Sequence, residues 1–460
     1  MKYFLAFLLI ITFHSASHAG IFNAQRTVLD NGMEVVVIPN HRAPIVHHML
    51  WYKTGSAQEL DGHSGVAHFL EHLLFKGTDH PERPLEAGEF SRRIKQLGGE
   101  DNAFTSKDYT AFYQTTSKQH LNTIMQMEAD RIRHAMPPVE HVLSERDVVI
   151  EERNQRTENN PQARFYETLN AALFPNHPYG RPVIGLPDDI RKMDHKDTKA
   201  FYDHWYHPNN TVLVIAGDVT LDQIRPDIQR IYGTLPKGPE VSRDFPPVQP
   251  ITQRVLITKE DSQVKQPLFL RATHAPSFHQ NKQHSLALQL LEEIIDGGTT
   301  TRLYKTLVVE DKKAINVSFS YSSDQYDTSS IWITATPADG TPLEELESAV
   351  ESLLKNIKEN GVTEQEITDA KKRLTNAAIF ARDSLSTPAH VIGRALTTGS
   401  ELNDIEAWDT QISSVTKEQI QIVIDQYLNI EKTKPIIGYL LPEMKKATEK
   451  TTETESETTQ

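Results

Sequence analysis

Short apolar runs separated by turn residues predict β-strands in the first half of the chain. Residues 27–29 and 33–38 flank the turn Asp30-Asn31-Gly32, so we expect them to pair as a hairpin. Two further strands are expected at residues 45–51 and 211–215. Apolar positions spaced as on one helix face predict helices at residues 65–75, 87–97 and 121–134. This alternation of strands and helices predicts an α/β or α+β layered fold.

A proline-rich stretch separates this pattern from a second set of elements. Residues 236–253 carry five prolines and are interpreted as a linker between an N-terminal domain, residues 20–235, and a C-terminal domain, residues 254–444. Beyond the linker we expect strands at 255–257 and 268–271, and helices at 285–295 and from 343 to the stop at Gly361. Residues 445–460 are almost entirely Lys, Thr, Glu and Ser, and are predicted to be a disordered tail.

The two halves of the chain resemble diverged copies of one another. Residues 64–78 align without a gap with residues 285–299, and their apolar positions agree. In the second copy, however, Gln289 and Glu293 stand where the first copy has histidines. A metal site built on those histidines can therefore occur only in the first half, and we expect one metal ion per chain.

The first nineteen residues differ from the rest and predict a signal peptide. A positive start at Lys2 precedes an apolar run over residues 3–13, and Ser17-His18-Ala19 places small residues where a signal peptidase reads them. The apolar run is too short for a stable membrane span, so we expect cleavage after Ala19 and no membrane anchor afterwards. An uncleaved N-terminal anchor is the alternative.

Composition narrows the possible chemistry and location. The 460 residues contain no cysteine, which excludes disulfides, thiolate zinc sites and cysteine nucleophiles. Any metal must be held by His, Asp or Glu. A cysteine-free exported chain suits a bacterial periplasm better than secretion. The formal net charge of −14 argues against a nucleic-acid partner, which needs clustered Lys and Arg.

The stretch His68-Phe69-Leu70-Glu71-His72 is the most informative in the chain. Residues four apart on a helix share a face, so His68 and His72 can point at one zinc ion. Glu71 lies beside that face, where it can accept a proton. The order H-x-x-E-H is that of the inverzincins. The alternative is a buried, purely structural histidine pair, but three titratable groups on a packed helix cost desolvation energy unless something pairs them.

A catalytic zinc ion needs a third protein ligand, and the acidic stretch of residues 145–152 offers one. Seven residues make almost two helical turns, so Glu145 and Glu152 share a face while Glu151 points elsewhere. Taken alone, such a stretch is more often a solvated helix surface stabilised by pairs four residues apart.

These motifs together resemble the insulinase/pitrilysin metallopeptidases, most closely their short bacterial members, which are similar to mitochondrial processing peptidase subunits. The resemblance extends from Thr27 to about Pro442. The residues that support the resemblance most strongly are 65–78, Asn102-Ala103-Phe104-Thr105 and 145–153, and residues 178–180 and 297–304 give weaker support. It implies an α+β fold of two similar α/β halves, each a mostly antiparallel sheet packed with helices. Two such pairs of halves would close around a chamber for peptides and unfolded segments.

The resemblance also implies roles for individual residues. His68, His72 and Glu152 would bind zinc, and Glu71 would be the general base. Glu145 would be the acid that orients the site. Residues Asn102, Ala103 and Phe104 would lie on an edge strand to which an extended substrate adds by main-chain pairing. The expected activity is that of an exported zinc endopeptidase.

One departure from the family pattern predicts a partner. Active members that consist of a single type of chain resemble one another in two residues that hold the substrate. One is an Arg, and the other is a Tyr seven residues later. The matching positions here are Val308 and Ile315, and Arg302 and Tyr304 nearby have the wrong spacing. We therefore expect a heterodimer with a zinc-less paralogous chain that supplies the Arg and Tyr, rather than a homodimer.

Two other classes of function remain open at this point. The same resemblance includes non-catalytic structural or assembly subunits, but those have lost the metal motif, which is intact here. A peptide-binding chaperone that uses the chamber without cleavage is the other. Zinc content and substitution of Glu71 would separate these possibilities from an endopeptidase.

Overall fold

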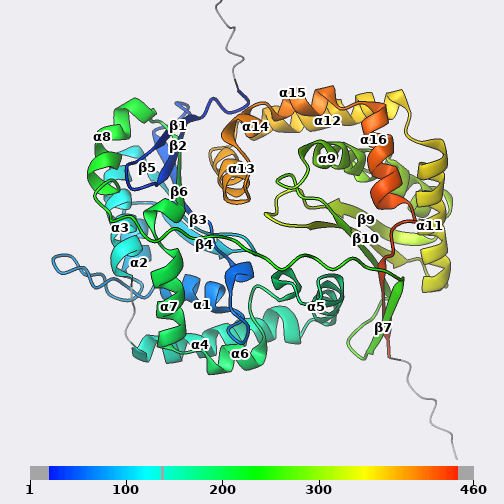
Figure 1. Ribbon diagram of the computed structural model, residues 1–460, viewed down its shortest axis with the longest axis horizontal. Helices are drawn as coiled ribbons and strands as arrows, with labels where there is room; N and C mark the ends of the chain where they lie inside the picture. Colours follow the sequence, from blue (N-terminus) through cyan, green and yellow to red (C-terminus); the bar gives the residue numbers. More distant parts are fainter. Residues whose placement is uncertain (1–19, 136–138, 444–460) are drawn as a thin grey trace, which may run out of the picture.

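The computed structural model of the chain describes residues 20–135 and 139–443, and Figure 1 shows its two sheets side by side with helices around them. The signal peptide expected at residues 1–19 and the tail expected at 445–460 lie outside these ranges. None of the described helices is both long and apolar enough to span a bilayer.

The first sheet has six strands in the order β1-β2-β6-β3-β5-β4. All its neighbouring pairs are antiparallel except β2 and β6, which run parallel. Its strands are β1 (Gln25–Val28), β2 (Glu34–Pro39), β3 (Ile45–Tyr52), β4 (Glu100–Thr105), β5 (Thr110–Ser117) and β6 (Thr211–Gly217). The expected hairpin of residues 27–29 and 33–38 is the β1–β2 pair.

The second sheet repeats this organisation with five strands in the order β7-β11-β8-β10-β9. Again one pair, β7 with β11, is parallel and the others are antiparallel. Its strands are β7 (Val255–Asp261), β8 (Leu268–Ala275), β9 (Ala314–Tyr321), β10 (Ser329–Pro337) and β11 (Ile436–Pro442). The predicted α+β fold of two similar halves with mostly antiparallel sheets is thus confirmed.

Eight α-helices follow one another before the linker stretch, and eight come after it in the described residues. The first group is α1 (Val66–Leu73), α2 (Glu89–Gln96), α3 (Leu121–His134), α4 (Val139–Arg153), α5 (Pro161–Leu173), α6 (Pro187–Lys192), α7 (His195–Trp205) and α8 (Leu221–Ile231). The second is α9 (Lys282–Asp296), α10 (Arg302–Tyr304), α11 (Leu343–Asn360), α12 (Glu364–Ala381), α13 (Ser386–Thr397), α14 (Leu402–Glu406), α15 (Trp408–Ser414) and α16 (Lys417–Val423). Residues 236–253 form neither helix nor strand.

Each sheet is covered on one face by helices of its own half and on the other by a helix of the opposite half. Alternate residues of β2 belong to different cores, because strand side chains point to alternate faces. One core contains α1, α3, α7 and α8, and the other contains Ala389 and Ile392 of α13. On the second sheet, α9, α11 and α16 pack on one face, and Phe165 and Leu169 of α5 pack on the other. Figure 1 shows α13 beside the first sheet and α5 beside the second.

Candidate metal centre

Helix α1 carries the H-x-x-E-H motif and is held in place by its apolar side chains. Phe69, Leu70 and Leu73 are fully buried in the core of the first sheet. Gly65 precedes the helix with φ of 96°, a left-handed conformation that favours glycine. A Cβ there would also come within 2.8 Å of the Gly185 Cα and of the Ile184 carbonyl oxygen. Glycine at position 65 is therefore required both by its backbone and by the close approach of Gly185.

Glu59 satisfies the backbone at the start of α1, a role that sequence reasoning missed. Its carboxylate oxygens accept hydrogen bonds from the backbone N–H groups of Gly65 at 2.9 Å and Ala67 at 3.0 Å. These N–H groups have no partner within the helix, and a carboxylate at this end also complements the helix dipole. Burial nevertheless raises the pKa of Glu59 to about 8. An acid seven residues before the first residue of a helix carries no local signal that it caps that helix.

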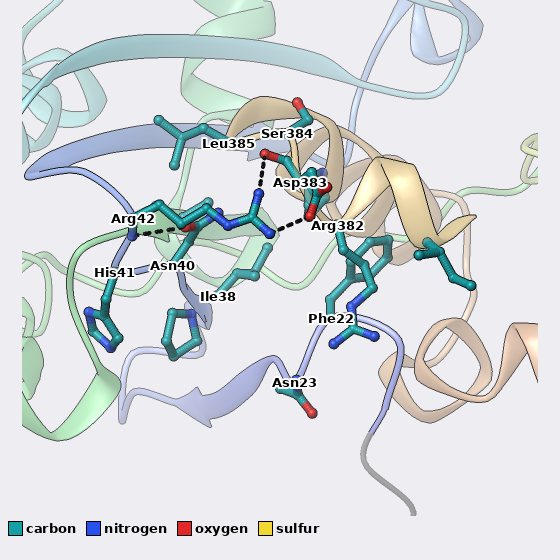
Figure 2. A pocket seen from close by; sticks show the side chains of 14 residues that line it. Phe22, Asn23, Ile38, Asn40, His41, Arg42, Arg382, Asp383, Ser384 and Leu385 are labelled. Atoms are coloured by element: carbon teal, nitrogen blue, oxygen red, sulfur yellow. Dashed lines mark hydrogen bonds and ion pairs between the residues drawn. The ribbon is translucent and has the colours of Figure 1, made fainter. Parts of the chain in front are cut away.

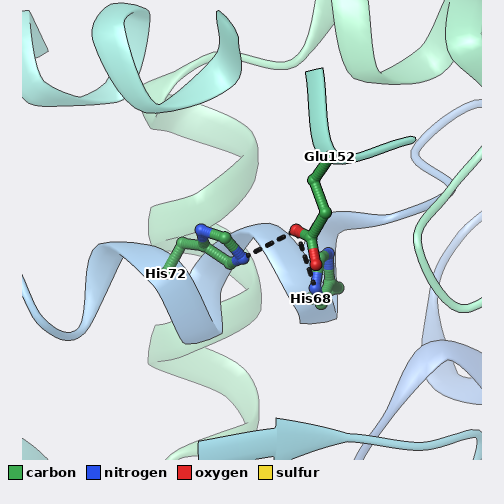
Figure 3. Close-up of side chains that lie close together, drawn as sticks. All are labelled: His68, His72 and Glu152. Atoms are coloured by element: carbon green, nitrogen blue, oxygen red, sulfur yellow. Dashed lines mark ion pairs between the residues drawn. The ribbon is translucent and has the colours of Figure 1, made fainter. Parts of the chain in front are cut away.

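His68, His72 and Glu152 converge on one point between α1 and α4 (Figure 3). Glu152 Oε2 lies 3.6 Å from His68 Nε2 and 3.2 Å from His72 Nε2. Donor atoms about 2.1 Å from a tetrahedral zinc ion lie about 3.4 Å from one another, so these separations fit a zinc site. Glu152 Oε2 is buried and faces both rings without a well-directed hydrogen bond, as a carboxylate oxygen poised for a cation would. In the described part of the chain, no other cluster of this kind occurs.

The two histidines differ in protonation because their surroundings differ. Burial and the neighbouring His72 lower the pKa of His68 to about 4, so this ring is neutral at pH 7. Burial opposes the charge on His72 as well, but contacts with the carboxylates of Glu145 and Glu152 outweigh it and raise its pKa to about 9. In the metal-free chain His72 therefore carries the positive charge that a cation would replace.

The far sides of His72 and Glu152 are held by further charged residues. Glu145 is buried, and its Oε1 lies 3.0 Å from His72 Nδ1 while its Oε2 lies 2.5 Å from Lys76 Nζ. Burial alone would raise the pKa of Glu145, yet these two hydrogen bonds lower it, so the residue stays ionised. Arg156 lies 2.7 Å from Glu152 Oε1 and leaves Oε2 turned toward the histidines.

Glu151, next to Glu152 in the sequence, faces solvent. It is exposed, and its carboxylate accepts hydrogen bonds from Asn154 and Gln155 on its own helical segment. The phase of helix α4 thus turns Glu145 and Glu152 toward α1 and Glu151 away from it. After Arg153 the helix widens into the π-helical turn η3 (Asn154–Glu158), a distortion often found at functional sites.

Glu71 is placed against the edge of the first sheet. Its Oε2 accepts a hydrogen bond from the Thr105 hydroxyl at 2.5 Å, and Thr105 is the last residue of β4. Burial raises the pKa of Glu71 above its usual value, although this hydrogen bond and the charge of His72 oppose the shift. A carboxylate with a raised pKa is a better proton acceptor at neutral pH.

Residues Asn102, Ala103 and Phe104 lie on β4, which is an edge strand of the first sheet. Asn102 is exposed and Ala103 packs against the core below α1. Phe104 points to the opposite face, where its ring stacks on His390 of α13 with centroids 5.5 Å apart. The strand therefore presents its free main-chain edge while both of its faces are packed.

The positions matching the motif in the second half are used for packing. Gln289 accepts a hydrogen bond from Trp408 Nε1 at 2.9 Å, and Glu293 forms an ion pair with Arg373. Glu292, which aligns with Glu71, accepts a hydrogen bond from the backbone N–H of Tyr321 on the edge strand β9. The second half thus keeps the helix but has neither histidine of the motif.

The positions where the family resemblance expects the substrate-holding Arg and Tyr carry other residues in this chain. Val308 lies in the π-helical segment η6 (Lys305–Glu310) and packs partly into the core of the second sheet. Ile315 is 50% exposed on β9. Arg302 makes a double hydrogen bond to Glu366, at 2.5 and 2.6 Å, and is therefore engaged within its own half.

Comparison with known proteins places these features in one family. The model of the insulinase family, peptidase family M16, matches residues 34–186, and the model of the peptidase M16 inactive domain matches residues 192–374. The chain is 29% identical over 374 residues to the zinc protease PqqE of Helicobacter pylori, covering 80% of this chain and 82% of that protein. It is 28% identical over 421 residues to an uncharacterized zinc protease of Mycobacterium leprae, covering 90% of this chain and 91% of that protein.

Solved structures show the same fold. The crystal structure of a protease from Helicobacter pylori superposes with a TM-score of 0.82 at 26% identity, covering 91% of this chain and 99% of that one. Pitrilysin superposes with a TM-score of 0.73 at 18% identity, covering 92% of this chain and 45% of pitrilysin. The latter likeness concerns the fold alone.

Proposed function

Because the chain belongs to the insulinase family of zinc proteases, peptidase family M16, we propose that it is a zinc-dependent endopeptidase acting on peptides or unfolded polypeptide segments. The observation that carries this proposal is the convergence of His68, His72 and Glu152 on one point, with Glu71 beside them. His68, Glu71 and His72 lie on α1, and Glu152 lies on α4.

Each residue of the site has a distinct role in this proposal. His68 and His72 offer Nε2 and Glu152 offers Oε2 to one zinc ion per chain. Zinc bound there would polarise the scissile carbonyl and make an attacking water more acidic. Glu71 accepts the proton of that water and delivers it to the leaving nitrogen, a task suited to its raised pKa. Glu145 acts through His72, whose ring it orients by the hydrogen bond to Nδ1.

The edge strand β4 suits an extended substrate. Its main-chain edge is free, and its terminal residue Thr105 is hydrogen-bonded to Glu71. A peptide that adds to β4 as a further strand would therefore run close to the proposed general base. In this arrangement residues 102–104 bind the substrate through backbone groups, so the site accepts many sequences but requires an extended chain.

We also propose that the active form includes a partner. Val308 and Ile315 occupy the positions where the family resemblance expects the substrate-gripping Arg and Tyr. A zinc-less paralogous chain carrying that pair would complete the site as a heterodimer. The signal peptide expected at residues 1–19 makes the periplasm the proposed compartment.

The proposal is tested by metal analysis together with peptide hydrolysis. We expect the purified chain to hold one zinc ion, and a mixture with the paralogous chain to cleave a fluorescence-quenched, unfolded peptide. Chelation should stop cleavage and added Zn²⁺ should restore it. A chain that retains no zinc at all, or cleavage that survives complete removal of metal, would contradict the proposal.

A further inference from the structure

The segment Gly20–Ala24 binds to the second half of the chain before it enters β1. Its main contact is Glu406, the last residue of α14. The Ile21 N–H donates to the Glu406 carbonyl oxygen at 3.0 Å. The carboxylate of Glu406 accepts hydrogen bonds from the N–H groups of Phe22 at 2.9 Å, Asn23 at 3.3 Å and Ala24 at 2.8 Å.

Three successive backbone N–H groups thus surround one carboxylate. Asn23 has φ of 54°, in the left-handed region, which turns its neighbours' N–H groups toward the same point. Such a concave backbone arrangement binds anions. Asp404, two residues before Glu406, forms an ion pair with Lys282, but no Lys, Arg or His within residues 20–135 and 139–443 pairs with Glu406. In the described chain, the Glu406 carboxylate therefore accepts hydrogen bonds from backbone N–H groups and has no cationic side chain as a partner.

The segment is also anchored by apolar side chains where the two halves meet. Ile21 and Phe22 are buried in the core that joins the first sheet to α13. Phe22 and Asn23 line a cleft of about 490 Å³ between residues 38–42 of the first half and 382–388 of the second (Figure 2). Arg42 crosses that cleft to form an ion pair with Asp383. The first described residues therefore help to connect the halves.

Gly20 lies directly against the Glu406 side chain. A Cβ at position 20 would come within 2.0 Å of Glu406 Oε2 and 2.8 Å of Glu406 Cβ, so a side chain there would displace the Glu406 side chain. The backbone nitrogen of a residue lies about 2.5 Å from its Cβ position, which places the Gly20 nitrogen within about 4.5 Å of that oxygen. Gly20 is also the residue that follows the expected cleavage site after Ala19.

We propose that Glu406 is the binding site for the α-ammonium group of a chain that begins at Gly20. Hydrolysis of the Ala19–Gly20 bond by a signal peptidase consumes one water and leaves a carboxylate on Ala19 and an ammonium group on Gly20. The uncleaved chain has a neutral amide at this position. Processing therefore creates an ion pair between the new N-terminus and α14, and it strengthens the link between the two halves. This inference rests on the expected cleavage and is independent of the metal site.

The test compares two forms of the full-length mature chain. One begins at Gly20 and the other retains Ala19, and each is made with Glu406 and with Glu406→Gln. The glutamine keeps an oxygen for the backbone N–H groups but removes the charge. Glu401→Gln serves as the control, because Glu401 is 73% exposed and, among the described residues, its one ion pair is with Arg26 at 3.7 Å. Zinc content, measured for every form, shows that the metal site is unchanged.

Two measurements decide the proposal. The first is the pKa of the α-amino group, followed by the pH dependence of its acylation. An ordinary α-amino group has a pKa of about 7.7–8.0. In the chain beginning at Gly20 we expect a higher value, with acylation at pH 7.5 about three- to tenfold slower than in the Glu406→Gln chain. The second is thermal unfolding, where we expect the Gly20 form to melt about 1–3 °C above the Ala19 form, a difference that Glu406→Gln removes.

Two results would overturn the proposal. An α-amino pKa that is the same with Glu406 and with Glu406→Gln means that no ion pair forms. If the Gly20 form still melts above the Ala19 form when both carry Glu406→Gln, the same conclusion follows. The α-amino pKa of the same wild-type chain unfolded in denaturant supplies a reference that needs no variant, so the inference stays testable if Glu406→Gln does not fold.

Discussion

Glu145 Oε1 lies 3.0 Å from Nδ1 of His72, the ring nitrogen opposite to the one that faces Glu152. An ionised carboxylate can only accept, so Nδ1 must carry the hydrogen. In the neutral ring this leaves the lone pair on Nε2, which points into the proposed metal site. Glu145 therefore selects the tautomer of His72 that can bind zinc.

Replacing Glu145 with Gln should weaken zinc binding without abolishing it. The amide can still accept from Nδ1, but it lacks the negative charge that makes the imidazole more basic. Loss of such a partner typically costs about 10–100-fold in metal affinity. Competition with a coloured chelator measures the change. Asp147→Asn, an exposed acid on the same helix, is the control, and equal affinities for the two variants would contradict this role.

Glu152→Ala should lose zinc, whereas Glu151→Ala should keep nearly one ion per chain. The first removes a proposed ligand from the convergent site, and the second removes an exposed side chain whose hydrogen bonds, among the described residues, are to Asn154 and Gln155. Metal analysis of the two purified variants is sufficient. The reverse pattern would mean that α4 presents a different face to α1 in solution.

Glu71→Gln should retain zinc but lose nearly all peptidase activity. The glutamine keeps the shape and can still contact Thr105, but it cannot take up a proton. General-base help is typically worth about 10²–10⁴-fold in rate. Hydrolysis should be measured in the assembly that shows activity, with zinc content in parallel. Glu292→Gln, at the aligned position of α9, is the matched control and should remain active. A fully active Glu71→Gln enzyme would falsify the assigned role.

Glu292 should make stability depend on pH in a defined window. Burial, with Asp296 and Glu293 nearby, raises its pKa to about 7, although the Tyr321 N–H opposes the shift. In the unfolded chain its pKa is about 4.3, so the folded chain holds the proton more tightly. Its stabilising contribution is complete below about pH 4 and is lost as the pH rises to 7.

The comparison that checks this uses thermal unfolding of the wild type and of Glu292→Gln. The melting temperature of the wild type should fall relative to that of the variant between about pH 4.5 and 7, and the two should run parallel above that. Curves that stay parallel over the whole range would show that Glu292 does not titrate there.

The mature chain alone should be weakly active or inactive. Without an Arg to hold the substrate backbone, misplacement of the scissile bond by about 1 Å can cost on the order of 10²-fold in rate. Sizing of the purified chain, and assays with and without a paralogous chain carrying the Arg and Tyr, measure this directly. Full activity of a homodimer, unchanged by any partner, would instead indicate that a clamp exists elsewhere in this chain.

The sequence by itself determined the parts of this protein that depend on local periodicity. His68 and His72 are four residues apart and Glu145 and Glu152 are seven apart, and helix geometry places each pair on one face. The same spacing turned Glu151 outward. Some of the strand and helix positions, the repeat of the two halves and the family followed from the order of apolar residues and from short motifs, whereas β5, β9, β10 and β11 were not predicted. All of these features involve residues close together along the chain.

Only the tertiary structure decided which distant residues meet. Glu59 at the start of α1, Thr105 beside Glu71 and Arg156 beside Glu152 carry no motif, because their partners are fixed by how whole helices and strands pack. The same holds for α5 and α13, each of which covers the sheet of the opposite half. Glu406 and Gly20 are 386 residues apart in the sequence and meet because the two halves are packed together. Such contacts depend on the shape of the whole fold, which no local pattern records.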